Sequence, residues 1–141
     1  MHPDLIFVPL LMQIVLTLIL LIRLGQAREQ AVRRGEVDQE RRGLHDDAWP
    51  DSVRKINNSI RNQFETPVLF YVLVICLWLL NAAGTAALVI AFCYAGLRIA
   101  HAWIHTTTNV VRIRKRLFQG SVVMLLLLTA MLLLALLSRV I

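Results

Sequence analysis

Four apolar stretches divide the chain, with one long polar segment between the first and the second. Residues 5–22 and 121–138 contain no charged side chain, and each is 18 residues long, within the range of a membrane-spanning helix. Residues 66–83 and 82–104 form two further apolar runs around a turn at Asn81–Thr85. The pattern predicts a polar loop at 24–51 and four spanning helices, at about residues 4–23, 52–81, 84–115 and 120–140.

The composition fits an all-α integral membrane protein with one four-helix domain over residues 1–141. Hydrophobic residues make up 57% of the chain, whereas soluble domains average roughly 45–50%. Four spans use more than half of the 141 residues, so no room remains for a separate catalytic domain. Cys76 and Cys93 both lie inside apolar runs, which argues against a disulfide framework.

The net charge of +6 is distributed in a way that predicts the topology. Nine Lys and Arg residues lie in 23–61 and four lie in 112–116, whereas Arg139 is the one base beyond the fourth run. The positive-inside rule therefore places both segments in the cytoplasm and both termini outside, as in a multi-pass protein of the inner membrane. Because these bases alternate with apolar runs, we expect the lipid bilayer and no nucleic acid as a partner.

Helical spacing indicates which faces pack inside the bundle. A proline and two polar residues of the first run recur at intervals of four: Pro9, Gln13 and Thr17. Small residues of the third run recur at the same interval: Ala83, Ala87, Ala91 and Ala95. Small residues at this spacing let membrane helices approach closely, so we expect a packing seam there. The fourth run is nearly all Leu, Val and Met, which favours a lipid-facing position.

Two polar stripes occur at the same depth near the cytoplasmic side. If the third helix extends to residue 115, five polar residues share one face: Arg98, His101, His105, Asn109 and Arg112. The second helix carries an opposing set: Asn58, Asn62 and Glu65. Ionisable groups at membrane depth cost about 2.5–3.5 kcal/mol each, so they face partners or a wet cavity. Two interpretations are open, a structural ion pair between Glu65 and Arg98 or a polar ligand pocket made by the whole set.

Metal binding and triad catalysis are both disfavoured by the same residues. His101 and His105 are one helical turn apart and could share an ion, but Glu65 is the one further ligand type at matching depth. No serine accompanies His101 and an acid at that depth, as a Ser–His–Asp triad requires. We therefore expect no metal site.

The polar motifs carry a resemblance to a known family. The segment 62–71, in which Asn62 and Glu65 precede Pro67, resembles the second-helix signature of the MAPEG family, membrane-associated proteins in eicosanoid and glutathione metabolism. Arg98 and His101, followed by His105, Asn109 and Arg112, are similar to its third-helix signature. The resemblance covers nearly the whole chain and favours a bacterial-type member.

This resemblance implies a homotrimer that binds glutathione, as co-substrate, between neighbouring subunits near the cytoplasmic side. The implied contacts to glutathione are Asn58, Asn62, Glu65, Arg98 and His101. Arg112 would stabilise the glutathione thiolate, with His105 as a second catalytic donor. The synthases of the family carry an arginine in place of Asn58 and tyrosines in place of His101 and His105, so this chain departs from them within the pocket.

Two functions follow from the resemblance and its departures. The first is a glutathione-dependent transferase or peroxidase that acts on a lipophilic electrophile from the bilayer. The second is a membrane scaffold or binding protein that keeps the fold without thiol activation. The apolar faces select only for apolarity, so they do not identify the lipophilic small molecule.

Overall fold

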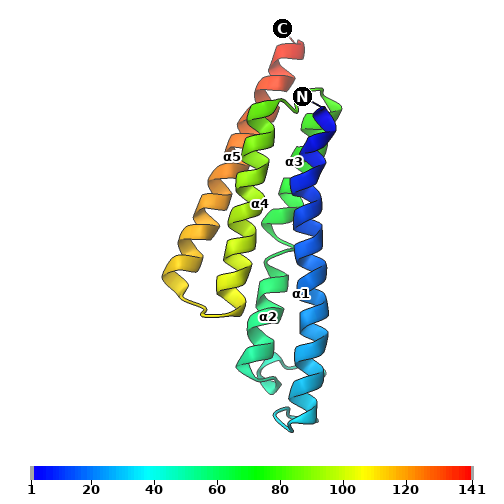
Figure 1. Ribbon diagram of the computed structural model, residues 1–141, viewed down its shortest axis with the longest axis vertical. Coiled ribbons are helices and arrows are strands. Elements are labelled where there is room, and N and C mark those ends of the chain that lie inside the picture. The colour runs from blue at the N-terminus through cyan, green and yellow to red at the C-terminus, as the bar shows by residue number, and fades with distance from the viewer. Residues whose placement is uncertain (1, 141) are drawn as a thin grey trace.

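The computed structural model describes residues 2–140, with side chains up to residue 139, and the regular structure in this range is helical (Figure 1). Two short 3-10 helices accompany five α-helices. Their bounds are η1 Pro3–Ile6, α1 Phe7–Arg33, η2 Asp46–Ala48, α2 Asp51–Arg61, α3 Thr66–Leu79, α4 Thr85–Thr106 and α5 Val111–Val140. The spans Pro3–Arg33, Asp51–Leu79, Thr85–Thr106 and Val111–Arg139 are long and apolar enough to cross a membrane. The predicted all-α, four-span membrane architecture is confirmed.

The first helix is longer than the apolar pattern suggested. α1 continues to Arg33 because residues 24–33 are mostly good helix formers, and Leu24 and Ala31 on this stretch are buried. It ends in a Schellman motif: the Glu36 N–H donates to the Ala31 carbonyl at 3.0 Å, and the Gly35 N–H donates to that of Val32 at 3.1 Å. Gly35 has a φ of 69°, which glycine adopts without a steric penalty. The polar connection is therefore shorter than the expected loop 24–51.

The last two helices meet at a different place from the predicted one. α4 ends at Thr106 and α5 begins at Val111, whereas the sequence pattern suggested helices at 84–115 and 120–140. Thr106 and Thr107 bond through their hydroxyls to carbonyls of the preceding turn, as threonines do when they compete with helical backbone bonds. Asn109 then adopts a φ of 52°, so the chain reverses before the basic run. Arg112 consequently belongs to α5.

The second span is two helices, where the sequence suggested one at 52–81. α2 and α3 are separated by residues 62–65, and Pro67 stands in the first turn of α3. A proline fits there because the first-turn N–H groups have no partner inside the helix. The span is therefore completely interrupted just before Pro67. α2 packs against α1 and α4, whereas α3 packs mainly against α5.

Two hydrophobic clusters form the core, one in each half of the molecule. The cluster near the termini is centred on residues of α3, α4 and α5: Phe70, Val74, Leu77, Ala87, Ala91, Tyr94, Leu125 and Leu128. The cluster near the α1–α2 connection includes Leu20, Leu24, Ala31, Val53, Ile56, Ile60 and Ala102. Four of the buried polar side chains come from α1, from α2, from the segment after it and from α4: Gln13, Ser59, Gln63 and Arg98. They surround the break in the second span.

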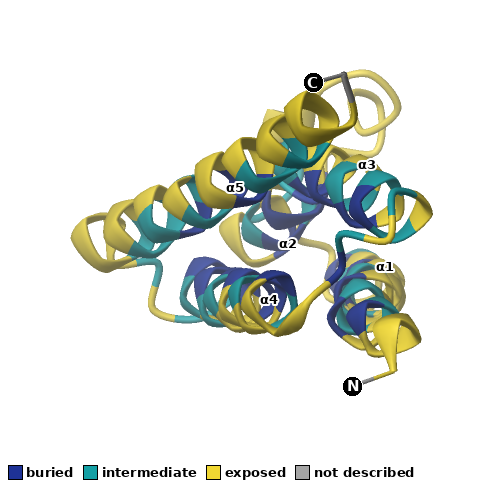
Figure 2. Ribbon diagram, turned by 90° about the horizontal axis from the view of Figure 1, so that it is seen from above, coloured by how far each residue is buried: buried dark blue, intermediate teal, exposed yellow. Residues whose placement is uncertain are grey.

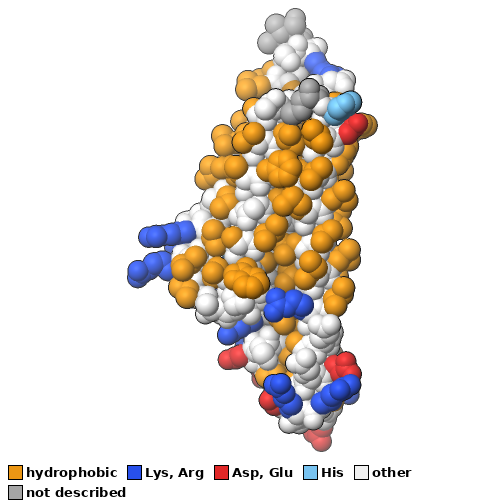
Figure 3. Space-filling model, in the orientation of Figure 1, with side chains coloured by type: hydrophobic (Ala, Val, Ile, Leu, Met, Phe, Trp, Pro, Cys, Tyr) orange, Lys and Arg blue, Asp and Glu red, His pale blue; other side chains and the backbone are white. Residues whose placement is uncertain are grey.

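Burial separates inward and outward faces as the sequence spacing indicated (Figure 2). The four alanines of the predicted seam are buried, and Pro9 and Gln13 of α1 are buried as well. These faces pack within the single chain. α5 buries Ser121, Leu125 and Leu128, whereas most of its other described side chains are exposed or half-buried, consistent with contact to lipid. Hydrophobic side chains cover the middle of the molecule, and charged side chains gather mostly at the end formed by the α1–α2 connection, here called the loop end (Figure 3).

Candidate functional site

The break between α2 and α3 leaves backbone carbonyl groups that the side chains of Gln63 and Arg98 satisfy, and Gln13 of α1 in turn bonds to Gln63. The Gln63 N–H donates to the Ile60 carbonyl at 2.8 Å, so the Ser59 carbonyl receives the Gln63 side-chain amide instead, at 3.3 Å. Gln13 of α1 donates from Nε2 to Gln63 Oε1 at 2.5 Å. Both glutamines are buried, and buried polar groups need such partners. The break is therefore a fixed part of the fold.

Arg98, which comes from α4, caps the carbonyl end of α2. Its Nη2 donates to the Asn62 carbonyl at 2.6 Å, and its guanidinium lies 5.9 Å from the ring centre of Phe118. A cation is favourable at this place because the carbonyl end of α2 is the negative end of its dipole. Arg98 is fully buried, and its Nε and Nη1 have no hydrogen-bond partner among the described residues. Nε and Nη1 of Arg98 are thus two buried donor atoms beside the break whose hydrogen bonds are not formed among the described residues.

The predicted ion pair between Glu65 and Arg98 is absent from the described part of the chain. Glu65 is exposed, at the N-cap of α3, and the salt bridges among the described residues all involve other side chains. The physical reason is the break itself, because it exposes the Asn62 carbonyl to Arg98. The guanidinium binds this backbone group in place of the carboxylate.

His101 and His105 lie one turn apart on the inner face of α4. Their exposed fractions are 3% and 5%, and their rings meet edge to face with centres 5.6 Å apart. Each Nδ1 is buried and has no partner in the part of the chain that the structure describes. Within that same part, no three His, Cys, Asp or Glu side chains are grouped closely enough to hold a metal ion. Both histidines also line the adjacent space.

Two adjoining cavities open beside these histidines. A cavity of about 330 Å³ is lined by Asn62, His101, His105, Val111, Arg114, Lys115 and Phe118. A second, of about 200 Å³, is lined by Asp51, Arg54, Lys55, Asn58, His105, Asn109 and Arg114. His105 and Arg114 line both cavities, so the two cavities are neighbours. Four bases against one acid favour an anionic ligand.

The comparison with known families matches this architecture. The profile of the MAPEG family matches residues 6–134. The chain belongs to the MAPEG family. No curated protein matches it significantly.

The structure brings together four of the residues to which the MAPEG resemblance gave a role. Asn58, Asn62, His101 and His105 line the joined cavities, and Arg98 lies behind Asn62 without lining either of them. Glu65 lies outside both. The three groups in which this chain departs from the MAPEG synthases, Asn58 and the two histidines, are therefore all at the cavity surface.

Arg112 occupies a different place from the one that the MAPEG signature suggested. It is exposed in the first turn of α5 and lines neither cavity. Arg114, two residues later, lines both, and its Nη1 donates to Asn109 Oδ1 at 2.7 Å. The sequence reasoning missed Arg114 because it extended the periodicity of α4 through the threonines. The run of three threonines before Asn109 is the signal that could have placed the reversal there.

Proposed function

We propose that this MAPEG protein is a glutathione-dependent transferase or peroxidase that acts on lipophilic electrophiles. The observation that carries the proposal is the pair of joined cavities, in which Arg54, Lys55, Arg114 and Lys115 surround the polar side chains of α2 and α4. Glutathione is a peptide with two carboxylates, an ammonium group and a thiol. A basic, partly enclosed pocket suits its net negative charge.

The second cavity suits the polar end of the peptide. Asp51 is the one acid in its lining, and it is already bonded to Arg54 at 3.1 Å. The bases around it are suitable partners for carboxylates, and Asn58 and Asn62 can donate further hydrogen bonds. In this arrangement the thiol end of glutathione lies in the larger cavity, near His101 and Phe118.

Arg114 is the residue to which we assign the stabilisation of the thiolate, in place of Arg112. A cysteine-type thiol has a pKa of about 8.5, and lowering it by about two units requires roughly 2.7 kcal/mol. One charge pair at about 4 Å and an effective dielectric of about 20 supplies roughly 4 kcal/mol before desolvation. The thiolate sulfur then attacks the electrophilic carbon, a C–S bond forms, and the displaced electron pair takes up a proton. His105, on the surface of both cavities, is placed to take up the proton that the thiol loses and to pass it to this electron pair.

We further propose that the protein is a homotrimer in the inner membrane. Its loop end lies on the cytoplasmic side. Glu65 supports the assembly because an exposed carboxylate is costly at membrane depth and calls for a neighbouring subunit. An apolar groove of about 340 Å³ between α3 and α5, which begins at Thr66, provides a surface for that subunit. The base count of the connecting segments supports the orientation.

The test is a titration of the purified protein in detergent with glutathione, followed by the ultraviolet absorbance of the thiolate. We expect the wild-type protein to bind glutathione and form thiolate, and Arg114→Ala to retain binding but lose thiolate. If Arg112→Ala loses the thiolate and Arg114→Ala keeps it, the assignment from the family signature is right and ours is wrong. Native mass spectrometry that finds only monomers or dimers would reject the trimer.

A binding or scaffold protein is the second candidate, and one observation favours it. Arg98 already bonds to the Asn62 carbonyl, so it has a structural role that needs no glutathione. The same titration separates the two functions. Binding of glutathione without thiolate, or no binding at all, in the wild-type protein would support the scaffold.

A further inference from the structure

The acidic residues of the chain are confined to its first half. All nine Asp and Glu residues occur at or before Glu65, so α4 and α5 contain none. In the α1–α2 region, four arginines form ion pairs with nearby acids: Arg33, Arg41, Arg54 and Arg61. The exposed bases at the start of α5 have no such acid on their own helix or on the preceding one. Their counter-charge must come from outside the α4–α5 hairpin.

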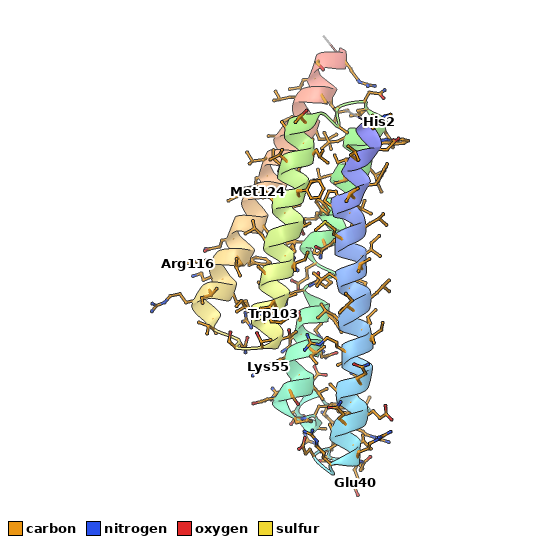
Figure 4. All side chains as sticks on the ribbon, viewed as in Figure 1. His2, Glu40, Lys55, Trp103, Arg116 and Met124 are labelled. Atoms are coloured by element: carbon orange, nitrogen blue, oxygen red, sulfur yellow. The ribbon has the colours of Figure 1, made fainter. Side chains whose placement is uncertain are left out.

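Two of these bases lie on the side of α5 that faces away from the cavities. Arg112, Arg116 and Gln119 recur at i, i+4 and i+7 and therefore share one helical face, and all three are exposed. The cavity is lined by the opposite side of the same turns, including Arg114 and Phe118. Figure 4 shows the Arg116 side chain extending sideways, away from the bundle. This face is thus separate from the candidate glutathione site.

The same face continues along α5 as exposed hydrocarbon. Val123, Leu126 and Leu127 follow Gln119 at helical spacing, and they are 49%, 64% and 44% exposed. The face therefore presents two guanidinium groups, then an amide, then a strip of apolar side chains. This order matches a phospholipid from its phosphate through its ester groups to its acyl chain.

The two arginines of this face lie at the depth where the hydrocarbon region of the membrane begins. Leu117 begins the unbroken uncharged part of α5, which extends to Ser138, so Arg116 stands where the hydrocarbon region starts. Trp103, near the end of α4, is 65% exposed, as is usual for tryptophan at the membrane interface. Long basic side chains at such positions reach the headgroups.

We propose that the face formed by Arg112, Arg116 and Gln119 is a binding site for an anionic phospholipid in the leaflet at the loop end. The two guanidinium groups, one turn apart, bind the phosphate with charge-assisted hydrogen bonds. Gln119 donates to an ester carbonyl, and the acyl chain lies along Val123 and Leu127. The site does not depend on the proposed enzymatic function.

The experiment measures lipid selectivity by electron paramagnetic resonance. The protein is reconstituted in phosphatidylcholine, and the motionally restricted fraction is compared for spin-labelled phosphatidylglycerol and spin-labelled phosphatidylcholine. We expect wild type to prefer phosphatidylglycerol. In the double variant Arg112→Ala/Arg116→Ala, the selectivity for phosphatidylglycerol over phosphatidylcholine should fall about tenfold, since each base near an anionic surface contributes to binding. Circular dichroism verifies that the variant is folded.

The matched control is Arg34→Ala/Arg42→Ala, which removes two exposed arginines of the α1–α2 connection that form no salt bridge in the described part of the chain. It changes the net charge equally, and we expect it to keep the preference. Equal loss in the control would show a general effect of charge and overturn the site, as would a wild type that prefers neither lipid. Displacement of the labelled phosphatidylglycerol by inorganic phosphate would indicate a free-anion site and would also overturn it.

Discussion

The buried pair Gln13 and Gln63 links α1 to the break in the second span, and its replacement by leucine tests whether this link is a main support of the break. In Gln13→Leu, Gln63 loses its partner at Oε1 but keeps its bond to the Ser59 carbonyl. In Gln63→Leu, two bonds disappear, and Gln13 is left with no partner for its amide because its Oε1 has none already. We therefore expect Gln63→Leu to be the more destabilising change.

The size of the effect follows from the burial of both amides. Leaving a buried polar group without a partner costs about 1–3 kcal/mol. Hydrogen bonds between membrane helices average about 0.6 kcal/mol and reach about 1.7 kcal/mol. Each single variant should thus lose about 1–3 kcal/mol of the free energy of unfolding. The double variant should lose less than the sum, by about 0.6–1.7 kcal/mol.

Equilibrium unfolding in mixed detergent micelles measures these differences, and Gln26→Leu is the control. Gln26 is exposed on the same helix, and its side chain forms no hydrogen bond with the residues that the structure describes, so its change should stay within about 0.5 kcal/mol. Strict additivity of the two single variants, or a larger loss in Gln13→Leu than in Gln63→Leu, would refute the reasoning.

Three further predictions concern other parts of the fold. Arg98→Leu leaves the Asn62 carbonyl without its donor and should cost about 1–3 kcal/mol of unfolding free energy, whereas Arg98→Lys keeps a donor and should cost less; equal losses would contradict the capping role. Ala91→Leu adds volume to a fully buried seam and should lower stability by about 1–3 kcal/mol, whereas Val89→Leu on the exposed side should have little effect. Asp47 has a pKa below its ordinary value of 3.8 because Arg41 donates a hydrogen bond to its carboxylate. The contact therefore stabilises the α1–α2 connection above pH 3.8, and this stabilisation is lost as the pH falls through the lower folded pKa. The fluorescence of Trp49, in a variant without Trp78 and Trp103, should report this loss. An unchanged signal down to pH 2, or a change complete above pH 5, would exclude this cause.

The number of membrane spans and their inward faces could be predicted from the sequence because they depend on hydrophobic periodicity alone. The buried alanines of α4 and the cavity positions of Asn62, His101 and His105 follow from that periodicity. The break in the second span could be predicted only in part. Pro67 signals a distortion, but the residues that stabilise it, Gln13 and Arg98, are distant in sequence and meet only in the folded bundle.

The role of Arg114 could not be predicted, because helical periodicity is valid only inside one helix. Once the chain reverses at Thr107–Val110, a residue's face depends on where the new helix begins. A start at Val111 directs Arg114 to the cavities and Arg112 to the outside. A shift of one residue would have rotated both by about 100°.

Asn62 belongs to the cavity through its side chain and to the joint between α2 and α3 through its carbonyl, and this double position has a practical consequence. A ligand that fills the cavity also restrains the joint, so it favours the folded protein over the unfolded one. A ligand at a free concentration 100 times its Kd stabilises the folded state by about 2.7 kcal/mol. Melting temperature can therefore serve as a screen for small molecules, including electrophiles that no assay of turnover would detect.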